Sequence, residues 1–150
     1  MRKKIIFICF FYLLSNGYVL SVEKDYFLTL RYNKVNVRSG PSEKYPIKFI
    51  YKKKYFPIKV IDSHYNYRKI IDVYNNSGWI HVSQLTRKKS AINISDLSII
   101  FKKPSIYSKP IAKLESGKMI IIKKCKKDWC KTSVENHKGW IQKDLLWGRL

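Results

Sequence analysis

Gly-Trp-Ile-His-Val-Ser-Gln-Leu at Gly78–Leu85 decides the fold, because a related phrase, Gly-Trp-Ile-Gln-Lys-Asp-Leu-Leu, returns at Gly139–Leu146. The similarity extends upstream of the phrase, where Pro46–Ile50 matches Pro110–Leu114 at an offset that differs by only a few residues. Self-similarity at one spacing is the signature of a repeated module. The sequence therefore predicts two copies of a module of about sixty residues.

Short strand-like segments with turn signals between them fill both copies, and no segment has a helical period. The expected strands are 26–33, 35–38, 47–51, 56–62, 68–74 and 78–82 in the first copy, and 92–96, 97–101, 111–114, 119–125, 129–134 and 138–142 in the second. This density predicts an all-β protein of two tandem small barrels. The barrels are expected over 26–86 and 92–148, with 87–91 as a polar linker. In the turn after the second strand, Gly40 is expected to take a positive φ.

Residues 1–21 have the pattern of an export signal. Basic residues at 2–4 precede an apolar run from Ile5 to Leu14, which is too short to span a bilayer as a helix. Small residues then offer two cleavage frames, ending at Gly17 or at Ser21. The alternatives are an uncleaved membrane anchor and a buried strand. Export would place the protein in the periplasm or at the cell envelope.

Cys125 and Cys130 are the two cysteines that would remain after the signal, and an even count in an oxidising compartment indicates a disulfide. They flank an expected hairpin turn at 126–128, which would bring them face to face. The three histidines have no metal-ligand spacing, so neither a metal site nor a cofactor is predicted.

The net charge of +21 comes from 25 lysines and 6 arginines against 10 acidic residues. Such a charge would attract nucleic acid, acidic phospholipid or anionic wall glycans. An AT-rich genome would also produce a lysine-rich surface without any functional role. The sequence leaves both interpretations open.

Catalysis is not expected. A nucleophile would need a histidine and a third orienting group, and no such set is apparent from the positions of the histidines. The ten acidic residues are spread along the chain rather than gathered in pairs. The sequence therefore indicates a protein that is not an enzyme.

Val-Asn-Val-Arg-Ser-Gly-Pro-Ser at Val35–Ser42, followed by Gly78–Ile80 and a closing Leu85, resembles the bacterial SH3-like (SH3b) domain family over roughly residues 28–86. The second copy, roughly 93–147, resembles the family more weakly, because it lacks this run but keeps Gly117 and Gly139–Ile141. The resemblance implies two tandem SH3-like β-barrels. Two departures in the first copy are Tyr67, where the family often has Trp, and Tyr55, where a turn glycine is common.

The same resemblance suggests an aromatic-lined groove for a peptide, glycan or protein. The candidate ligand-binding residues are Tyr32, Arg38, Tyr45, Tyr51 and Trp79 in the first copy, and Tyr107, Trp129 and Trp140 in the second. Trp79 and Trp140 have packing as an alternative role, and Arg38 has hydrogen bonding that ties its loop to the barrel.

The leading functional prediction is an exported, non-enzymatic binding module of the cell envelope that recognises peptidoglycan, its stem peptides or an envelope protein. One alternative is a cationic nucleic-acid or acidic-lipid binder driven by surface lysines. Another is an accessory scaffold subunit of an envelope complex.

Overall fold

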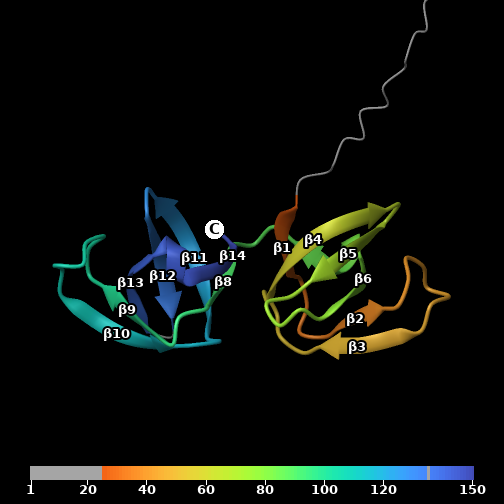
Figure 1. Ribbon diagram of the computed structural model, residues 1–150, viewed down its shortest axis with the longest axis horizontal. Coiled ribbons are helices and arrows are strands. Elements are labelled where there is room, and N and C mark those ends of the chain that lie inside the picture. Colours follow the sequence, from red (N-terminus) through yellow and green to blue (C-terminus); the bar gives the residue numbers. More distant parts are fainter. Residues whose placement is uncertain (1–24, 135) are drawn as a thin grey trace, which may run out of the picture.

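The computed structural model describes residues 25–134 and 136–150, which form two β-barrels side by side (Figure 1). The predicted export signal lies outside the described residues. The strands of the first barrel are β1 (Tyr26–Leu30), β2 (Val35–Arg38), β3 (Ile47–Tyr51), β4 (Pro57–His64), β5 (Tyr67–Ile71), β6 (Ser77–His81) and β7 (Leu85–Thr86). Those of the second are β8 (Ser90–Asn93), β9 (Leu97–Phe101), β10 (Pro110–Glu115), β11 (Met119–Lys126), β12 (Trp129–Val134), β13 (His137–Gln142) and β14 (Leu146–Arg149). A single 3₁₀ turn, η1 (Val82–Gln84) or η2 (Lys143–Leu145), precedes the last strand of each barrel.

The two sheets have the same topology. The first runs β3-β2-β6-β5-β4-β1-β7 and the second β10-β9-β13-β12-β11-β8-β14, so each strand has its counterpart seven places later. The register repeats as well, because Arg38 pairs with Trp79 and Phe101 pairs with Trp140. The prediction of an all-β fold with two tandem barrels is confirmed.

The core of the first barrel is aliphatic. Its buried members come from every strand except β3, and they are Leu30, Val35, Val37, Ile58, Val60, Ile70, Ile80 and Leu85. On β6 the side chains alternate, so that Gly78 and Ile80 are buried and Trp79 is half-buried on the opposite face. Gly78 is required for packing, because a Cβ there would lie 2.4 Å from a methyl carbon of Val37.

The second barrel contains a buried polar pair at equivalent positions. Asn93 occupies the place of Leu30, since each pairs with the leucine that opens the last strand of its own barrel. Ser98 likewise occupies the place of Val35, and its hydroxyl donates to Asn93 Oδ1 at 2.7 Å. Asn93 Nδ2 donates to the carbonyl oxygens of Leu114 at 2.9 Å and Glu115 at 3.0 Å. Burial of these polar groups is tolerated because they are hydrogen-bonded.

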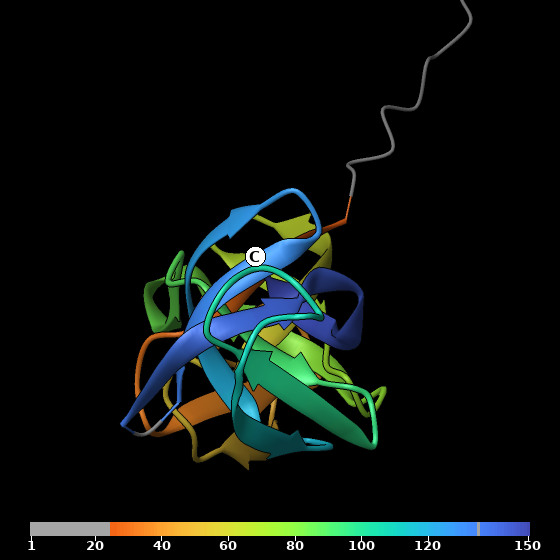
Figure 2. The same ribbon diagram turned by 90° about the vertical axis from the view of Figure 1, so that its left-hand side faces the viewer.

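The barrels contact each other through their first and last strands. Arg149 Nη1 donates to the carbonyl oxygen of Phe27 at 2.8 Å, and the Phe27 and Trp147 rings meet edge to face at 4.9 Å. Ser90 Oγ also donates to the carbonyl oxygen of Tyr55. Figure 2 looks along the long axis and shows the second barrel in front of the first.

Only three residues, 87–89, separate β7 from β8. The strand expected at 92–96 begins instead at Ser90, inside the segment that we expected to be linker. Ser90 and Ala91 are fully buried, which explains why this part of the chain is strand rather than exposed connection.

Two further details differ from the sequence expectations. β5 ends at Ile71 rather than near residue 74, because the buried Asp72 carboxylate accepts backbone N–H bonds from Tyr74 and Asn76 and turns the chain. Gly40 does not have a positive φ, since the described positive-φ glycines are Gly117 and Gly148. Gly40 is instead needed for close approach, because a Cβ there would lie 2.5 Å from the Tyr45 ring.

Candidate functional site

A groove in the first barrel follows the β2–β3 loop, residues 39–46. The loop is closed at its base, where Arg38 Nη1 donates to the carbonyl oxygen of Tyr45 at 2.8 Å and Ser39 N donates to that of Pro46 at 3.1 Å. This is the loop-tying role that the sequence allowed for Arg38. The Tyr45 ring packs over Gly40 and holds the loop in a compact form.

Three adjoining hollows make up this groove, with volumes of about 460, 160 and 420 Å³. The first two share Glu43, Tyr67 and His81, and the first and third share Pro41, Ser42 and Lys44. Because they share walls, they form one depression, which we call the loop groove. It lies between the β2–β3 loop, the β4–β5 turn and the end of β6.

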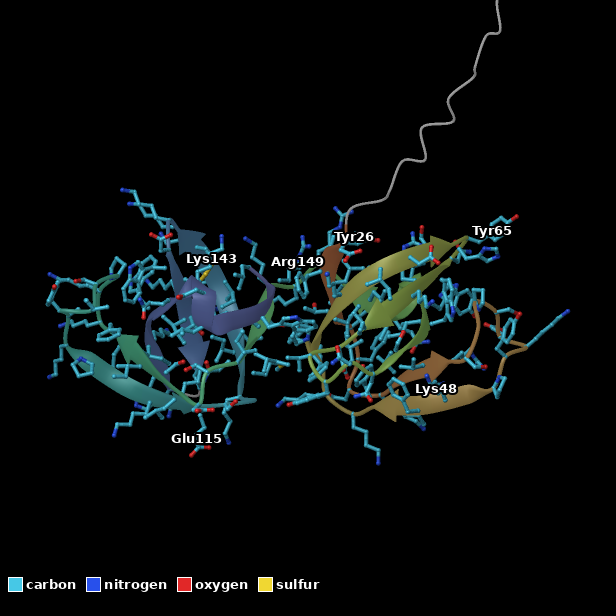
Figure 3. All side chains as sticks on the ribbon, viewed as in Figure 1. Tyr26, Lys48, Tyr65, Glu115, Lys143 and Arg149 are labelled. Atoms are coloured by element: carbon cyan, nitrogen blue, oxygen red, sulfur yellow. A yellow bond between two sulfur atoms is a disulfide. The ribbon has the colours of Figure 1, made fainter. Side chains whose placement is uncertain are left out.

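Aromatic side chains form much of the wall. Tyr67 is buried, with 8% of its surface exposed, and its ring meets the His81 ring edge to face with the ring centres 5.1 Å apart. Tyr65, in the β4–β5 turn, is 88% exposed and meets His64 edge to face at 4.8 Å. Figure 3 shows Tyr65 at the outer end of this hairpin. Rings at the rim and base offer flat surfaces on which a peptide or sugar can stack.

The groove carries charges of both signs. Glu43 and Lys44 are both exposed, and no ion pair in the described chain involves either one. Arg38 lines the same depression. Such a surface can pair with a ligand that itself carries both an ammonium and a carboxylate group.

Ser83 and His81 lie in hydrogen-bond contact, with Oγ and Nδ1 2.8 Å apart. His81 Nδ1 also accepts the backbone N–H of Ser83 at 3.3 Å, which makes His81 the N-cap of η1. The capping role explains this pair without a catalytic role, and within the described residues no carboxylate is hydrogen-bonded or ion-paired to the His81 ring.

Tyr51 lies outside the loop groove. Its hydroxyl donates to Asp72 Oδ2 at 2.8 Å, and its ring stacks on Phe56 at 5.3 Å. Burial, followed by the hydrogen bond and the negative charge of Asp72, raises the pKa of the Tyr51 phenol above its usual value. This predicted ligand residue therefore packs against the core and holds the β5–β6 turn.

The remaining predicted residues are dispersed. Tyr32 is 52% exposed in the β1–β2 loop, and Trp79 is half-buried on the outer face of β6. In the second barrel, Tyr107 is 93% exposed in the β9–β10 loop, while Trp129 is half-buried and meets Phe101 edge to face at 5.7 Å. Trp140 is half-buried beside Phe101 in the sheet. Of the eight candidates, only Arg38 and Tyr45 line the loop groove.

Sequence reasoning missed most of the groove wall. Tyr65, Tyr67, Glu43 and His81 come from segments far apart in sequence and meet only when β2, β5 and β6 align. One signal was available, because Tyr67 stands at a position where aromatic residues are common. His81 directly follows the repeated Gly-Trp-Ile phrase, at a strand end where a side chain reaches the barrel rim.

The predicted disulfide is present, with Cys125 and Cys130 directly opposite in register and their Cα atoms 4.0 Å apart. Over the described residues, no set of three or more potential metal ligands gathers in one place. No helix in residues 25–134 or 136–150 is long and apolar enough to cross a membrane.

Comparison with known proteins gives a family match in both halves of the chain. The family model described as "Bacterial SH3 domain" matches residues 31–86 and again 95–148. No curated protein matches the chain.

Similar solved structures include NlpC2 and NlpC1 from Trichomonas vaginalis and an NlpC/P60 family protein from Bacillus cereus, with TM-scores of 0.38, 0.37 and 0.36. The identities are 12%, 12% and 10%, over 83%, 84% and 81% of this chain. The chain spans about half of these structures, 48%, 46% and 56% of their lengths respectively.

Proposed function

Because the chain belongs to the bacterial SH3 domain family, we propose that it is an exported, non-enzymatic binding module of the cell envelope that recognises peptidoglycan, its stem peptides or an envelope protein. The loop groove of the first barrel is the observation that carries this proposal. It is open, aromatic and charged with both signs, whereas the other predicted ligand residues do not converge on it.

The chemistry of a stem peptide suits this groove. Such a peptide offers free carboxylates and, where one of its residues is a diamino acid, an ammonium group on the side chain of that residue. Glu43 would accept the ammonium, and Lys44 and Arg38 would attract carboxylates. The exposed Tyr65 ring would cover an apolar or sugar face of the ligand. Several weak contacts of this kind, on a pre-formed surface, are typical of peptide-recognition grooves.

A sedimentation assay on insoluble wall material tests the proposal. The purified chain should co-sediment with peptidoglycan at moderate salt, and Tyr65→Ala should lower the bound fraction several-fold because it removes the exposed ring. Tyr107→Ala is the matched control, since Tyr107 is as exposed but lies in the second barrel. Absence of binding by the unmodified chain would contradict the proposal for peptidoglycan, and equal losses in both variants would contradict the assignment to the first barrel.

Glu43→Gln tests the charge component, because it keeps the size of the side chain and removes its negative charge. We expect it to weaken binding to wall material while Asp144→Asn, an equally exposed change in η2, has no effect. The melting temperature of both variants should equal that of the unmodified chain.

Surface lysines support a second candidate function, a nucleic-acid or acidic-lipid binder. The described residues contain only two ion pairs, Lys59 with Asp25 and Lys118 with Glu115, so most lysines are not paired with acids. Affinity would then fall steeply with salt, with a slope set by the phosphates neutralised, and would not respond to Tyr65→Ala. The salt dependence of binding therefore separates the two candidates.

A further inference from the structure

A second cleft, at the junction of the barrels, gathers most of the arginines. It has a volume of about 450 Å³ and is lined by Arg31, Arg68, Arg87 and Arg149, together with Tyr26 and Leu28 from β1. Arg149 comes from β14, Arg87 from the connection between the barrels, and the other two from the first barrel. Figure 3 shows Arg149 at this junction, beside Tyr26.

The composition of the chain makes this gathering unusual. Lysine outnumbers arginine 25 to 6, yet four of the five described arginines line one cleft. A general drift toward a basic surface would place lysines there instead. Arginine differs from lysine in its planar fork of five N–H donors, which matches the oxygens of phosphate and carboxylate.

No acidic side chain lines the cleft. Asp25, which directly precedes the lining residue Tyr26 in sequence, forms an ion pair with Lys59 at 2.6 Å. Among the described residues, neither ion pair involves an arginine. The four guanidinium groups stay protonated in proteins, so they place four uncompensated positive charges around one opening.

Three of the arginines are held in place by backbone carbonyls. Arg31 Nε donates to Leu85 at 3.0 Å, Arg68 Nη1 to Tyr65 and Tyr67 at 2.8 and 2.9 Å, and Arg149 Nε to Arg87 at 2.9 Å. Each guanidinium keeps further N–H donors beyond these bonds. The Arg87 side chain makes no hydrogen bond with any described residue. The cleft thus combines three positioned forks with one that is available for a ligand.

We propose that this cleft binds a doubly charged phosphate group, a monoester or a diphosphate, carried on an organic group that contacts Tyr26 and Leu28. A carboxylate has one charge and two oxygens, whereas such a phosphate has a charge near −2 and three or more terminal oxygens. Four arginine guanidinium groups with no acidic side chain among them therefore match a phosphate better than a carboxylate. The volume is within the range of small-molecule sites and exceeds what a single inorganic ion fills.

This site is separate from the loop groove and does not depend on wall recognition. The two clefts have no lining residue in common, and Arg87 lies only at the junction. Loss of wall binding in the sedimentation assay would therefore leave the phosphate site intact, and the reverse also holds.

Calorimetric titration of the purified chain with inorganic pyrophosphate, at fixed ionic strength, tests the proposal. We expect saturable binding at one site and about a tenfold loss of affinity in Arg87→Gln, the size of one charge-assisted contact. The affinity of Arg87→Lys should lie between those of the unmodified chain and Arg87→Gln, because lysine keeps the positive charge but lacks the planar set of N–H donors. Lys109→Gln, in the exposed β9–β10 loop, is the matched control and should retain the affinity.

Three results would overturn the proposal. They are absence of saturable binding, equal weakening in Arg87→Gln and Lys109→Gln, and equally tight binding of malonate, a dicarboxylate. Folding is not expected to confuse the test, because the Arg87 side chain is exposed and unbonded; equal melting temperatures verify this.

The source of the phosphate is distinguished by a vesicle assay. Phosphatidylcholine vesicles containing phosphatidic acid, a phosphate monoester, should bind the chain through Arg87 if the natural ligand is a lipid headgroup, and pyrophosphate should then displace it. Binding of pyrophosphate without vesicle binding supports a soluble phosphate ligand.

Discussion

The two barrels share one topology but stabilise it with different chemistry at equivalent positions. Where the first barrel buries Leu30 and Val35, the second buries Asn93 and Ser98. Where the β4–β5 hairpin places Ser63 opposite Arg68, the β11–β12 hairpin places Cys125 opposite Cys130. The backbone arrangement therefore tolerates exchange between apolar packing, hydrogen bonding and covalent cross-linking.

The surfaces diverge in the same way. In the first barrel, Arg38 closes the β2–β3 loop over a groove, whereas Phe101 stands at the equivalent position of the second barrel and packs against Trp129. The disulfide cross-links the β11–β12 hairpin, whereas in the β4–β5 hairpin the Arg68 guanidinium donates hydrogen bonds to the carbonyl oxygens of Tyr65 and Tyr67. The two barrels therefore differ in how the loop after their second strand is held and in how the long hairpin is fixed.

Exchanging the core residues should break both barrels and has the largest expected effect. Leu30→Asn buries an amide in the place of an apolar side chain, and Asn93→Leu removes the side-chain hydrogen bonds to the Leu114 and Glu115 carbonyls and to the Ser98 hydroxyl. We expect each to lower the free energy of unfolding by about 3 kcal/mol or more. Amide hydrogen exchange, resolved by residue, assigns the loss to one barrel.

A double variant sharpens this comparison. Asn93→Leu with Ser98→Val restores two apolar side chains that match those of the first barrel, and should recover part of the loss. No recovery would show that the Asn93–Ser98 pair does not act as a unit.

Reduction of the Cys125–Cys130 disulfide should destabilise the second barrel by about 2 kcal/mol, because the cross-link closes only a short loop. The first barrel, which has no described cysteine, should keep its exchange protection. Urea unfolding with and without dithiothreitol measures the loss of stability on reduction.

In the opposite direction, Arg68→Ala should weaken the first hairpin by about 1 kcal/mol, because it removes the hydrogen bonds to the Tyr65 and Tyr67 carbonyl oxygens, and should leave the second hairpin unchanged.

The β3–β4 and β10–β11 turns contain Tyr55 and Gly117 at matched places, with φ values of 62° and 74°. Glycine adopts this conformation without the steric cost that other residues have. Gly117→Ala should therefore lower stability by about 1 kcal/mol, even though its Cβ would make only an ordinary 3.4 Å contact with the Tyr74 hydroxyl. An unchanged melting temperature would contradict this.

Tyr51→Phe should have an effect of similar size, a loss of about 1 kcal/mol at neutral pH through the missing hydrogen bond to Asp72. The raised pKa of Tyr51 means that its contribution is fully present below the unfolded value near pH 10 and declines as pH rises above it. The stability difference between the two proteins should thus shrink in alkali. Unfolding in urea from about pH 8 to pH 11 measures it, and a constant difference would argue against a buried neutral phenol.

The repeat and the turn residues allowed the strands and the tandem arrangement to be predicted. Prediction was weaker where burial depends on the partner barrel, as at Ser90, which forms strand because it packs at the junction. It was also weaker for Tyr51, whose aromatic ring fits a groove as well as a core. Composition cannot separate these roles, because the same ring surface is favourable in both places.

By itself, the sequence determined the fold class, the duplication and the cysteine pair, because these depend on local alternation, turn chemistry and spacing along the chain. Only the tertiary structure decided which side chains meet. The loop groove requires β2, β5 and β6 to align, and the arginine cleft requires β14 to pack against β1. Residues 31, 68, 87 and 149 are dispersed in sequence, so their convergence depends on contacts that no local pattern records.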